Sequence, residues 1–412
     1  MFKKFTAWAG APIYHPPMSS NPSALAAIID QIRHARTLAR PEDRLLRLRG
    51  GGSKDFFGSS LQGQVLETGA LRGVLSYEPT ELVVTVQAGT PLHELEALLQ
   101  EKNQCLPFEP PHFGSLSAST ATVGGMVAAG LSGPARASAG ATKDFVLGMR
   151  CVNGRGEHLT FGGQVMKNVA GYDVSRLLAG SWGTLGVITE VSLKVLSFAP
   201  CEATLVCDLA QAPALDLLQR WGGQPLPLNA SCWVHDAVAG AAGGDKLFVR
   251  LRGAVAAVQA ALPRMRADVL ALGGAAEVMD NAQAGPDWAA ARDQRLPFFS
   301  TPPAPDLCLW RLSVAQTTPV LDLPYAQFIE WHGGQRWLWA PTSAAAQLQA
   351  LAQRAGGHAT LFRRPAGALA DGDAGAPVFA ALDATQSRIQ SALQHQFDPD
   401  GVFNTRRLLS VV

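Results

Sequence analysis

The distribution of glycine constrains this chain more than any other feature of its sequence. Of the 41 glycines, 23 lie between Gly50 and Gly186. Glycine tolerates positive φ angles and lets the backbone approach a ligand closely. The same residues would also serve ordinary turns in a β-rich domain. The spacing of the glycine clusters therefore has to decide between a binding domain and a turn-rich one.

The first cluster follows a predicted strand at residues 45–48 and has the sequence Arg-Gly-Gly-Gly-Ser-Lys. Consecutive N–H groups in such a turn can point inward and form a nest for an anion, which suits a diphosphate. A flexible turn is the simpler alternative. The spacing of the lysine does not fit the phosphate-binding loop of nucleoside triphosphatases. The residues concerned are Gly50, Gly51, Gly52, Ser53 and Lys54.

The second cluster lies within residues 105–142, which we expect to be irregular. Small and hydroxyl-bearing residues dominate it, so its backbone can wrap around a polar ligand with Ser and Thr hydroxyls as donors. A disordered linker is the alternative, and Met126 and Val127 argue against it. The candidate ligand-binding positions are Ser117, Thr120, Val123, Gly124 and Gly125.

The third cluster places a short predicted helix, residues 174–178, between two glycine turns. The second turn leads directly into a predicted strand that begins at Val187. Backbone groups of Gly186 and Ile188 would be free to meet a flat heterocycle. Asp173, at the start of the helix, fits an N-cap better than a catalytic acid, because Asp side chains accept hydrogen bonds from the first turn.

The character of the chain changes near residue 200, where helices and strands begin to alternate. This pattern indicates an α+β domain with a largely antiparallel sheet. We expect a disordered lead at residues 1–20, a two-lobed domain at 21–198 split near 105, a second domain at 199–390, and a C-terminal segment at 391–412. That last segment is turn-rich and is expected to pack back on the first domain.

Composition excludes several classes of function. The net charge of +1 favours neither nucleic acid nor an anionic membrane surface. The six cysteines are scattered without a CxxC pair, so we expect reduced thiols in the cytosol and no iron–sulfur or zinc site. No apolar run reaches the roughly 18 residues of a membrane-spanning helix, so membrane association would come only through partners.

The three clusters, in this order and at this separation, resemble the FAD-binding domain of the vanillyl-alcohol-oxidase (PCMH) type. The likeness covers about residues 40–200 and the tail at 397–404. Three strings are similar to the FAD-binding E subunits of bacterial glycolate oxidases: residues 130–134 (GLSGP), 143–148 (KDFVLG) and 165–173 (VMKNVAGYD). The resemblance implies an α+β fold, with a two-lobed FAD-binding PCMH-type domain and an α+β cap domain.

The resemblance also implies a role for each residue of the clusters. The first cluster would cradle the FAD pyrophosphate, and the second would close its other side. Gly186 and Ile188 would line the adenosine or ribityl part, while Asp144 and Val146 would lie near the isoalloxazine ring. Some relatives attach flavin through a histidine or cysteine in the glycine loop. Ser53 and Lys54 stand there in this chain, so non-covalent FAD is expected.

A substrate site is harder to find. Oxidation of a 2-hydroxy acid needs a base for the hydroxyl proton and a cation for the carboxylate. The histidine-rich string of catalytic relatives is absent from this sequence. The remaining candidates are His332 as the base and Arg336 as the anchor, across the turn at Gly333. A hairpin whose tryptophans merely pack the sheet is the alternative.

Two functional hypotheses follow from the resemblance. In the first, the chain is an FAD-binding subunit of a glycolate oxidase complex, and it transfers electrons between a catalytic flavin subunit and an iron–sulfur subunit. In the second, it is a self-sufficient FAD-dependent dehydrogenase of a small 2-hydroxy acid such as glycolate or D-lactate. A third interpretation, a scaffold that has lost its ligand, is disfavoured by the intact glycine loops.

Overall fold

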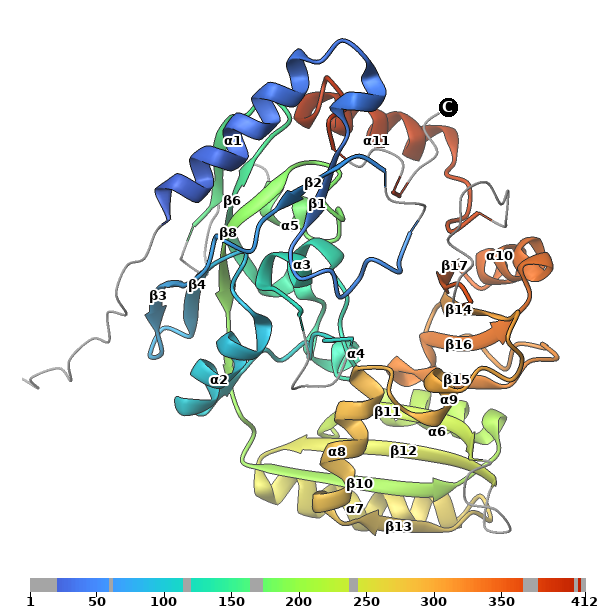
Figure 1. The fold of residues 1–412 in the computed structure, drawn as a ribbon. Helices are drawn as coiled ribbons and strands as arrows, with labels where there is room; N and C mark the ends of the chain where they lie inside the picture. Colours follow the sequence, from blue (N-terminus) through green and yellow to red (C-terminus); the bar gives the residue numbers. More distant parts are fainter. Residues whose placement is uncertain are drawn as a thin grey trace, which may run out of the picture.

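A computed structural model describes residues 21–58, 62–113, 120–163, 173–236, 244–365, 377–403 and 407–408. The described residues form a first domain with two small two-stranded sheets and a five-stranded sheet, and a cap domain with one eight-stranded sheet (Figure 1). The expected α+β fold is confirmed. The described ranges do not include the predicted lead at 1–20, nor the string at 165–172.

The smaller sheet of the first domain consists of two parallel strands, β1 (Leu46–Arg49) and β2 (Gln64–Glu67). Helix α1 (Pro22–Thr37) contributes Ile28 and Ile32 to the core beneath it. Asn21 caps this helix by accepting from the Ala24 N–H, and proline at the first helical position has no N–H to leave unpaired.

The chain returns to this small sheet near its C-terminus. After α11 (Ala384–Phe397), drawn in red near the top of Figure 1, the segment from Asp398 packs onto β1. The Leu46 N–H donates to the Val402 carbonyl at 2.6 Å, and Phe403 is fully buried against Leu46. Asp398 holds this turn by accepting from the N–H groups of Val402 and Phe403.

The second sheet of the first domain has five strands in the order β3-β4-β8-β6-β7. Its strand pairs are all antiparallel, and the expected hairpin at Asn153 joins β6 to β7. Strands β3 and β4 belong to this sheet, so the division between the two sheets falls between Glu67 and Val74, well before the expected position near 105. The strands are β3 (Val74–Glu78), β4 (Val83–Gln87), β6 (Val146–Val152), β7 (His158–Gly162) and β8 (Val187–Lys194).

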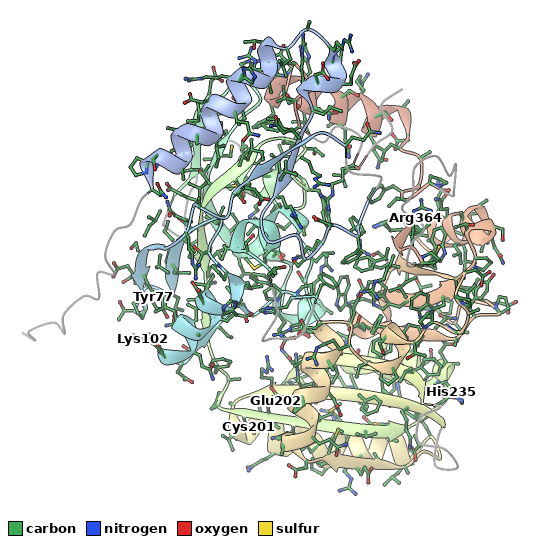
Figure 2. All side chains as sticks on the ribbon, in the orientation of Figure 1. Tyr77, Lys102, Cys201, Glu202, His235 and Arg364 are labelled. Carbon is green, nitrogen blue, oxygen red and sulfur yellow. The ribbon has the colours of Figure 1, made fainter. Side chains whose placement is uncertain are left out.

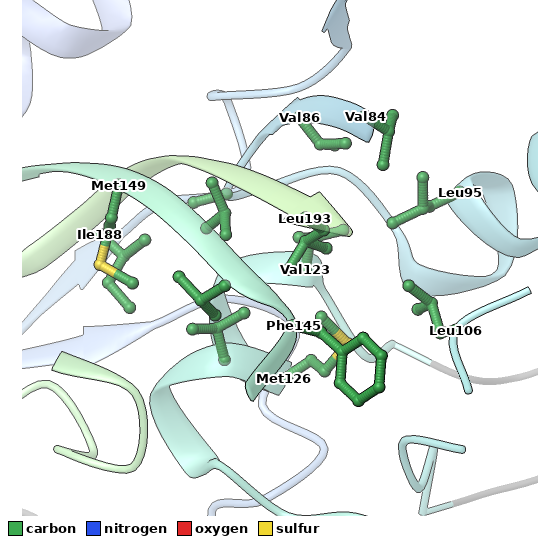
Figure 3. Close-up of a cluster of buried hydrophobic side chains, with 14 of the residues drawn as sticks. Val84, Val86, Leu95, Leu106, Val123, Met126, Phe145, Met149, Ile188 and Leu193 are labelled. Carbon is green, nitrogen blue, oxygen red and sulfur yellow. The ribbon is translucent and has the colours of Figure 1, made fainter. Parts of the chain in front are cut away.

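Helices cover the five-stranded sheet and form the main core of the first domain. Figure 3 shows Leu95 of α2 (Leu92–Glu101) and Met126 of α3 (Val123–Ala129) among the buried side chains near Leu193 of β8. The first domain also contains the short helix α5 (Val174–Leu178). Two short strands, β5 (Gln104–Cys105) and β9 (Leu196–Ser197), pair antiparallel to each other.

The expectation of irregular backbone over 105–142 is wrong in part. This stretch contains α3, α4 (Arg136–Ala139) and the 3-10 turn η3 (Thr142–Phe145). The small residues that suggested a loop instead allow α3 to pack very close to β4. A Cβ at Gly124 would lie 2.6 Å from the Cβ of Ala88, a separation that only glycine permits.

The cap domain is built on an eight-stranded sheet in the order β13-β10-β12-β11-β15-β16-β14-β17, with every pair antiparallel. Figure 2 labels Cys201 and Glu202 where the chain enters this sheet. The short edge strand β13 was not predicted. The strands are β10 (Cys201–Asp208), β11 (Leu228–Asp236), β12 (Gly244–Gly253), β13 (Ala276–Met279), β14 (Cys308–Ser313), β15 (Gln327–Glu330), β16 (Gln335–Ala340) and β17 (His358–Arg363).

Helices pack on the cap sheet and bury its apolar side chains. Trp221 and Trp310 are fully buried in two separate clusters of this domain. The helices are α6 (Gln211–Gly222), α7 (Val255–Leu270), α8 (Asn281–Arg292), α9 (Pro297–Ser300) and α10 (Ala345–Arg354). Within the ranges that the structure describes, no helix is long and apolar enough to cross a membrane.

The two domains are joined by charged and aromatic contacts. Glu109 of the first domain binds Arg250 of β12 at 2.6 Å and Arg252 at 3.1 Å. Within the first domain, Phe57 stacks on Trp182 with 4.3 Å between the ring centroids. Its ring also packs against Phe362 of β17, with 5.3 Å between the centroids. These contacts fix the cap over one end of the first domain.

Candidate cofactor site

A cleft with an empty volume of about 680 Å³ lies in the first domain where the glycine clusters meet. Three segments form it: the loop after β1, the start of α3, and the turn that leads into β8. The structure thus brings together the predicted residues Gly50, Gly51, Gly52, Ser53, Lys54, Gly124, Gly125, Gly186 and Ile188.

The loop after β1 offers unused hydrogen-bond donors to this cleft. Among the described residues, none of the four backbone N–H groups from Gly50 to Ser53 has a hydrogen-bond acceptor. By contrast, the N–H groups of Val123 and Gly124 at the start of α3 donate to Thr90 and Ala88. Unsatisfied backbone donors in a cleft are rare and favour an anionic ligand. The loop therefore fits the diphosphate of FAD.

Close packing explains why this loop needs glycine. A Cβ at Gly51 would lie 1.4 Å from the Thr120 carbonyl oxygen, and Gly52 has a φ of +73°. Thr120 thus acts as a neighbour of the loop through its backbone, and it does not line the cleft. Thr122 does line the cleft, and its hydroxyl caps α3 by accepting from the Gly125 N–H.

Lys54 supplies a buried positive charge beside the loop. Its side chain is only 8% exposed, donates to the Ser53 hydroxyl and lies over the Phe113 ring. Burial and the nearby Arg407 lower the pKa of Lys54 to about 8, while Asp293 opposes that shift. A diphosphate in the cleft would restore the ordinary pKa by stabilising the ammonium ion.

Arg407 comes from the C-terminal segment and was not predicted as a site residue. It is 6% exposed, donates to the Lys54 carbonyl at 2.9 Å and lies over the Trp182 ring at 4.9 Å. Burial lowers its pKa to about 10, so it stays charged at neutral pH. The sequence did predict that the C-terminal segment packs back on the first domain. It did not indicate that the side chain of Arg407 would contact the glycine loop.

Other predicted cofactor residues lie elsewhere. Val123 is fully buried in the core, and Val146 is 3% exposed in the same cluster. Asp144 is exposed and caps its own 3-10 turn by accepting from the Ala141 N–H. The structure does not bring Asp144 or Val146 to the cleft. Ser117 lies outside the described residues.

Sequence reasoning missed several residues that line the cleft. Thr68 follows β2, while Trp182 and Gly183 precede β8. Trp182 has a positive φ of 53°, and its ring stacks on that of Phe57. Asp173 does act as the expected N-cap, since its carboxylate accepts from the Arg176 N–H.

His332 lies between the two domains, with both ring nitrogens engaged by hydroxyls. Its Nδ1 pairs with Ser231 of β11 and its Nε2 with Ser138 of α4, each at 3.0 Å. Burial lowers its pKa to about 4, so the ring is neutral at physiological pH. His332 does not line the cavities described here, and its hydrogen bonds indicate a bridging role.

Arg336 is fully buried. Its guanidinium donates to the backbone carbonyls of Gly333, Thr318 and Pro319 at 3.3, 2.5 and 2.8 Å. A carboxylate could reach Arg336 only by displacing these bonds. The geometry therefore does not support Arg336 as a substrate anchor, and shows it holding the loop at 318–319 against the hairpin.

A second, larger cavity continues from the cleft between the two domains. It has an empty volume of about 1680 Å³ and shares Ala129 and Trp182 with the cleft. Neither cavity is lined by a metal-binding cluster, because no group of three or more His, Cys, Asp or Glu side chains suited to a metal ion occurs among the described residues.

Comparisons with known proteins agree with this geometry. The family "FAD binding domain" matches residues 24–162. A solved structure of alkyldihydroxyacetonephosphate synthase has a TM-score of 0.63 and covers 94% of this chain and 74% of its own, at 14% identity, so it shows the fold alone. Glycolate oxidase subunit GlcD of Bacillus subtilis is 30% identical over 195 residues, 46% of this chain and 40% of that protein.

A further relative matches nearly the whole molecule. Glycolate oxidase subunit GlcE of Escherichia coli (strain K12) is 42% identical over 382 residues, which are 93% of this chain and 96% of that protein. The likeness thus includes the cap as well as the cofactor cleft. Among the FAD-binding oxidoreductases of the PCMH type, this chain belongs to the family of glycolate oxidase subunit GlcE.

Proposed function

We propose that this chain binds FAD without a covalent bond and transfers electrons within a glycolate oxidase complex, beside a catalytic flavin subunit and an iron–sulfur subunit. The observation that supports this most directly is the loop from Gly50 to Ser53, whose four N–H groups have no acceptor in the described part of the chain, with the ammonium of Lys54 beside it. When bound, FAD would supply the capacity to take up and release two electrons.

The residues around the cleft have distinct tasks in this proposal. The backbone of Gly50 to Ser53 holds the diphosphate, and Lys54 balances its charge. Trp182 and Phe57 form a stacked aromatic wall where the cleft meets the second cavity. Such a wall keeps water from that end of the site and strengthens the electrostatic interactions inside it.

Dissociable binding is supported by the chemistry of the lining. Among the described residues of the cleft there is neither histidine nor cysteine, the side chains through which relatives attach flavin covalently. The hydroxyl of Ser53 and the amine of Lys54 stand at the loop instead. FAD would therefore be released when the protein unfolds.

The partners are inferred from the names of the relatives. The protein that matches 93% of this chain is a glycolate oxidase subunit, and the GlcD subunit matches 46% of it. An electron-transfer role in such a complex fits a chain whose proposed base and anchor, His332 and Arg336, are both engaged in structural bonds. We infer a cytoplasmic location, with membrane association only through partner subunits.

The first test is an absorption spectrum of the purified chain before and after acid precipitation. Flavin bands that pass into the supernatant are expected. Bands that stay in the pellet would show a covalent bond, and a chain that takes up no FAD at all would refute the cofactor assignment.

The second test concerns the division of labour in the complex. Glycolate oxidation is measured with the isolated FAD-loaded chain and with the complex assembled from all subunits. We expect turnover only in the complex. An isolated chain that oxidises glycolate at the rate of the complex would instead establish a self-sufficient dehydrogenase.

A further inference from the structure

The cavity between the domains has a lining that the cofactor cleft does not explain. Its first-domain wall contains Arg136 of α4, and its cap wall contains Arg311 and Ser313 of β14 with His358 of β17. Because the cavity shares Ala129 and Trp182 with the cleft, it opens directly beside the proposed FAD site.

Neither arginine of this cavity forms an ion pair within hydrogen-bonding reach among the described residues, although the charge of Asp144 acts on Arg136 and opposes the lowering of its pKa by burial. The guanidinium of Arg136 lies over the Trp331 ring at 4.5 Å, and that of Arg311 lies over the Phe362 ring at 5.5 Å. Neither takes part in a salt bridge among the described residues. The Nε of Arg311 is buried and has no hydrogen-bond partner within the ranges that the structure describes.

The surroundings reinforce this positive charge. No aspartate or glutamate is among the described residues that line the cavity. Burial and the charge of Arg136 lower the pKa of Arg311 to about 10, so both guanidiniums remain ionised at neutral pH. Two partly buried cations that line one space without a carboxylate in that lining are costly, and an anionic ligand would relieve that cost.

One acidic residue approaches Arg311 from another side. Glu330 lines a smaller neighbouring cavity together with Arg311, but its carboxyl group accepts from Trp337 and Gln335. Burial raises the pKa of Glu330 to about 7, so it is only partly ionised at neutral pH. Glu330 therefore does not neutralise the larger cavity.

Two neutral polar groups complete the lining near Arg311. Ser313 and His358 are partners in the register of strands β14 and β17. Burial and the charge of Arg311 lower the pKa of His358 below its ordinary value, which keeps the imidazole neutral. A hydroxyl and a neutral imidazole can each donate a hydrogen bond to the oxygen on the carbon next to a carboxylate, or accept one from it.

We propose that this cavity binds the carboxylate of a small 2-hydroxy or 2-oxo acid, held by Arg136 and Arg311. A guanidinium matches a carboxylate with two parallel N–H donors, and stacking on an aromatic ring fixes its plane. Ser313 and His358 are the partners for the 2-oxygen of the acid. The inference rests on the proposed function, which puts flavin in the adjoining cleft. It assigns the carboxylate to Arg136 and Arg311 in place of Arg336 and names no base, in keeping with turnover only in the complex.

The test uses the full-length FAD-loaded chain and oxalate, a two-carbon dicarboxylate that cannot be dehydrogenated. Binding is followed by isothermal titration calorimetry and by the fluorescence of tryptophan, since Trp331 lies beneath Arg136. Arg311→Gln and Arg136→Gln should each raise the dissociation constant of oxalate by roughly tenfold to a hundredfold. Arg311→Lys should give a smaller increase because the charge is retained.

The exposed Arg266 of α7 offers a control with the same change of charge. Arg266→Gln should leave oxalate binding unchanged. An equal effect of Arg266→Gln, equal affinity for sulfate, or no oxalate binding by the FAD-loaded chain would overturn the carboxylate site. Failure to bind FAD would instead overturn the proposed function. Should Arg311→Gln not fold, as judged by its melting curve, Arg136→Gln carries the same test.

Discussion

The two binding spaces of this molecule are built in opposite ways. The cofactor cleft is made largely of backbone, with glycines at Gly50 to Gly52 and N–H groups as the donors. The cavity between the domains is made of long side chains, with Arg136 and Arg311 brought from different domains and laid on aromatic rings. A backbone site is set by local sequence, whereas a side-chain site depends on how the cap docks.

The sharpest test of the backbone site is Gly51→Ala. Its Cβ would lie 1.4 Å from the Thr120 carbonyl oxygen, so the loop must move and its N–H groups no longer converge. We expect nearly complete loss of FAD from the purified chain, measured as the ratio of flavin to protein absorbance. Gly69→Ala is the matched control, because nothing lies within 4 Å of its added Cβ. Normal FAD content in Gly51→Ala would show that backbone convergence is not what holds the cofactor.

The docking of the cap can be tested through Glu109. Burial would raise its pKa, but Arg250 and Arg252 outweigh that effect and bring the pKa below its ordinary value. Glu109→Gln leaves the buried Arg250 without its carboxylate, while Arg252 keeps its ion pair with Glu202. It should lower the free energy of unfolding by roughly 3 to 5 kcal/mol. Chemical denaturation measures this, with the exposed Glu81→Gln as control.

The same carboxylate predicts a dependence on pH. Because the folded pKa of Glu109 lies below 4.5, its contribution to stability is present above that value and is lost as the pH falls through the folded pKa. The Gln variant should lose stability less steeply than the wild-type chain in acid. Parallel acid-unfolding curves for the two proteins would contradict a role for this ion cluster.

An Arg336 variant tests whether this arginine of the cap has a structural role, unlike Arg311, which we propose to bind a ligand. Arg336→Ala removes a buried guanidinium that donates to three backbone carbonyls, and it should cost about 3 kcal/mol of stability. Oxalate binding by the folded fraction should stay unchanged, in contrast to Arg311→Gln. A selective loss of oxalate binding with unaltered stability would reinstate Arg336 as an anchor.

The smallest expected effect concerns Lys54, a side-chain charge at the backbone site. Its pKa of about 8 in the free protein means that the ammonium is present below pH 8 and is lost above it. The dissociation constant of FAD should therefore rise above pH 8, by up to about tenfold per pH unit. Lys54→Met should flatten this profile in a fluorescence titration of FAD. An unchanged slope would exclude coupling between Lys54 and the diphosphate.

The free energy of unfolding of the FAD-free chain should show the opposite dependence on pH from its affinity for FAD. Burial lowers the pKa of Lys54 in the folded state relative to its ordinary value of 10.5. Between pH 8 and 10.5 the unfolded chain thus binds more protons, and the contribution of Lys54 to stability rises with pH. This opposite trend distinguishes loss of affinity from unfolding.

The sequence predicted most of what depends on neighbouring residues. The strand at Leu46, the glycine loop after it and the N-cap at Asp173 follow from local chemistry, and the structure has them. The antiparallel cap sheet was also expected. The direction in which the Arg336 side chain points could not be predicted. Arg336 lies in a strand whose six residues are all buried, so the sequence shows no alternation between a buried and an exposed face.

The residues of the second cavity could not be predicted, because nothing in the sequence connects α4 with β14. Arg136 follows a glycine-rich turn, and Arg311 lies between apolar residues of a buried strand. Their proximity arises from the contact of two domains. Likewise Arg407 reaches Lys54 only because the end of the chain returns to the loop at its beginning.

That return has a consequence for how the protein is made. The residues that complete the first domain, among them Val402, Phe403 and Arg407, leave the ribosome only after the entire cap. Domains usually fold in the order of their synthesis, but here the apolar surface around Leu46 and Ile28 must wait for the last part of the chain. The nascent protein should therefore depend on chaperones longer than its domain order suggests, and cofactor loading should follow translation.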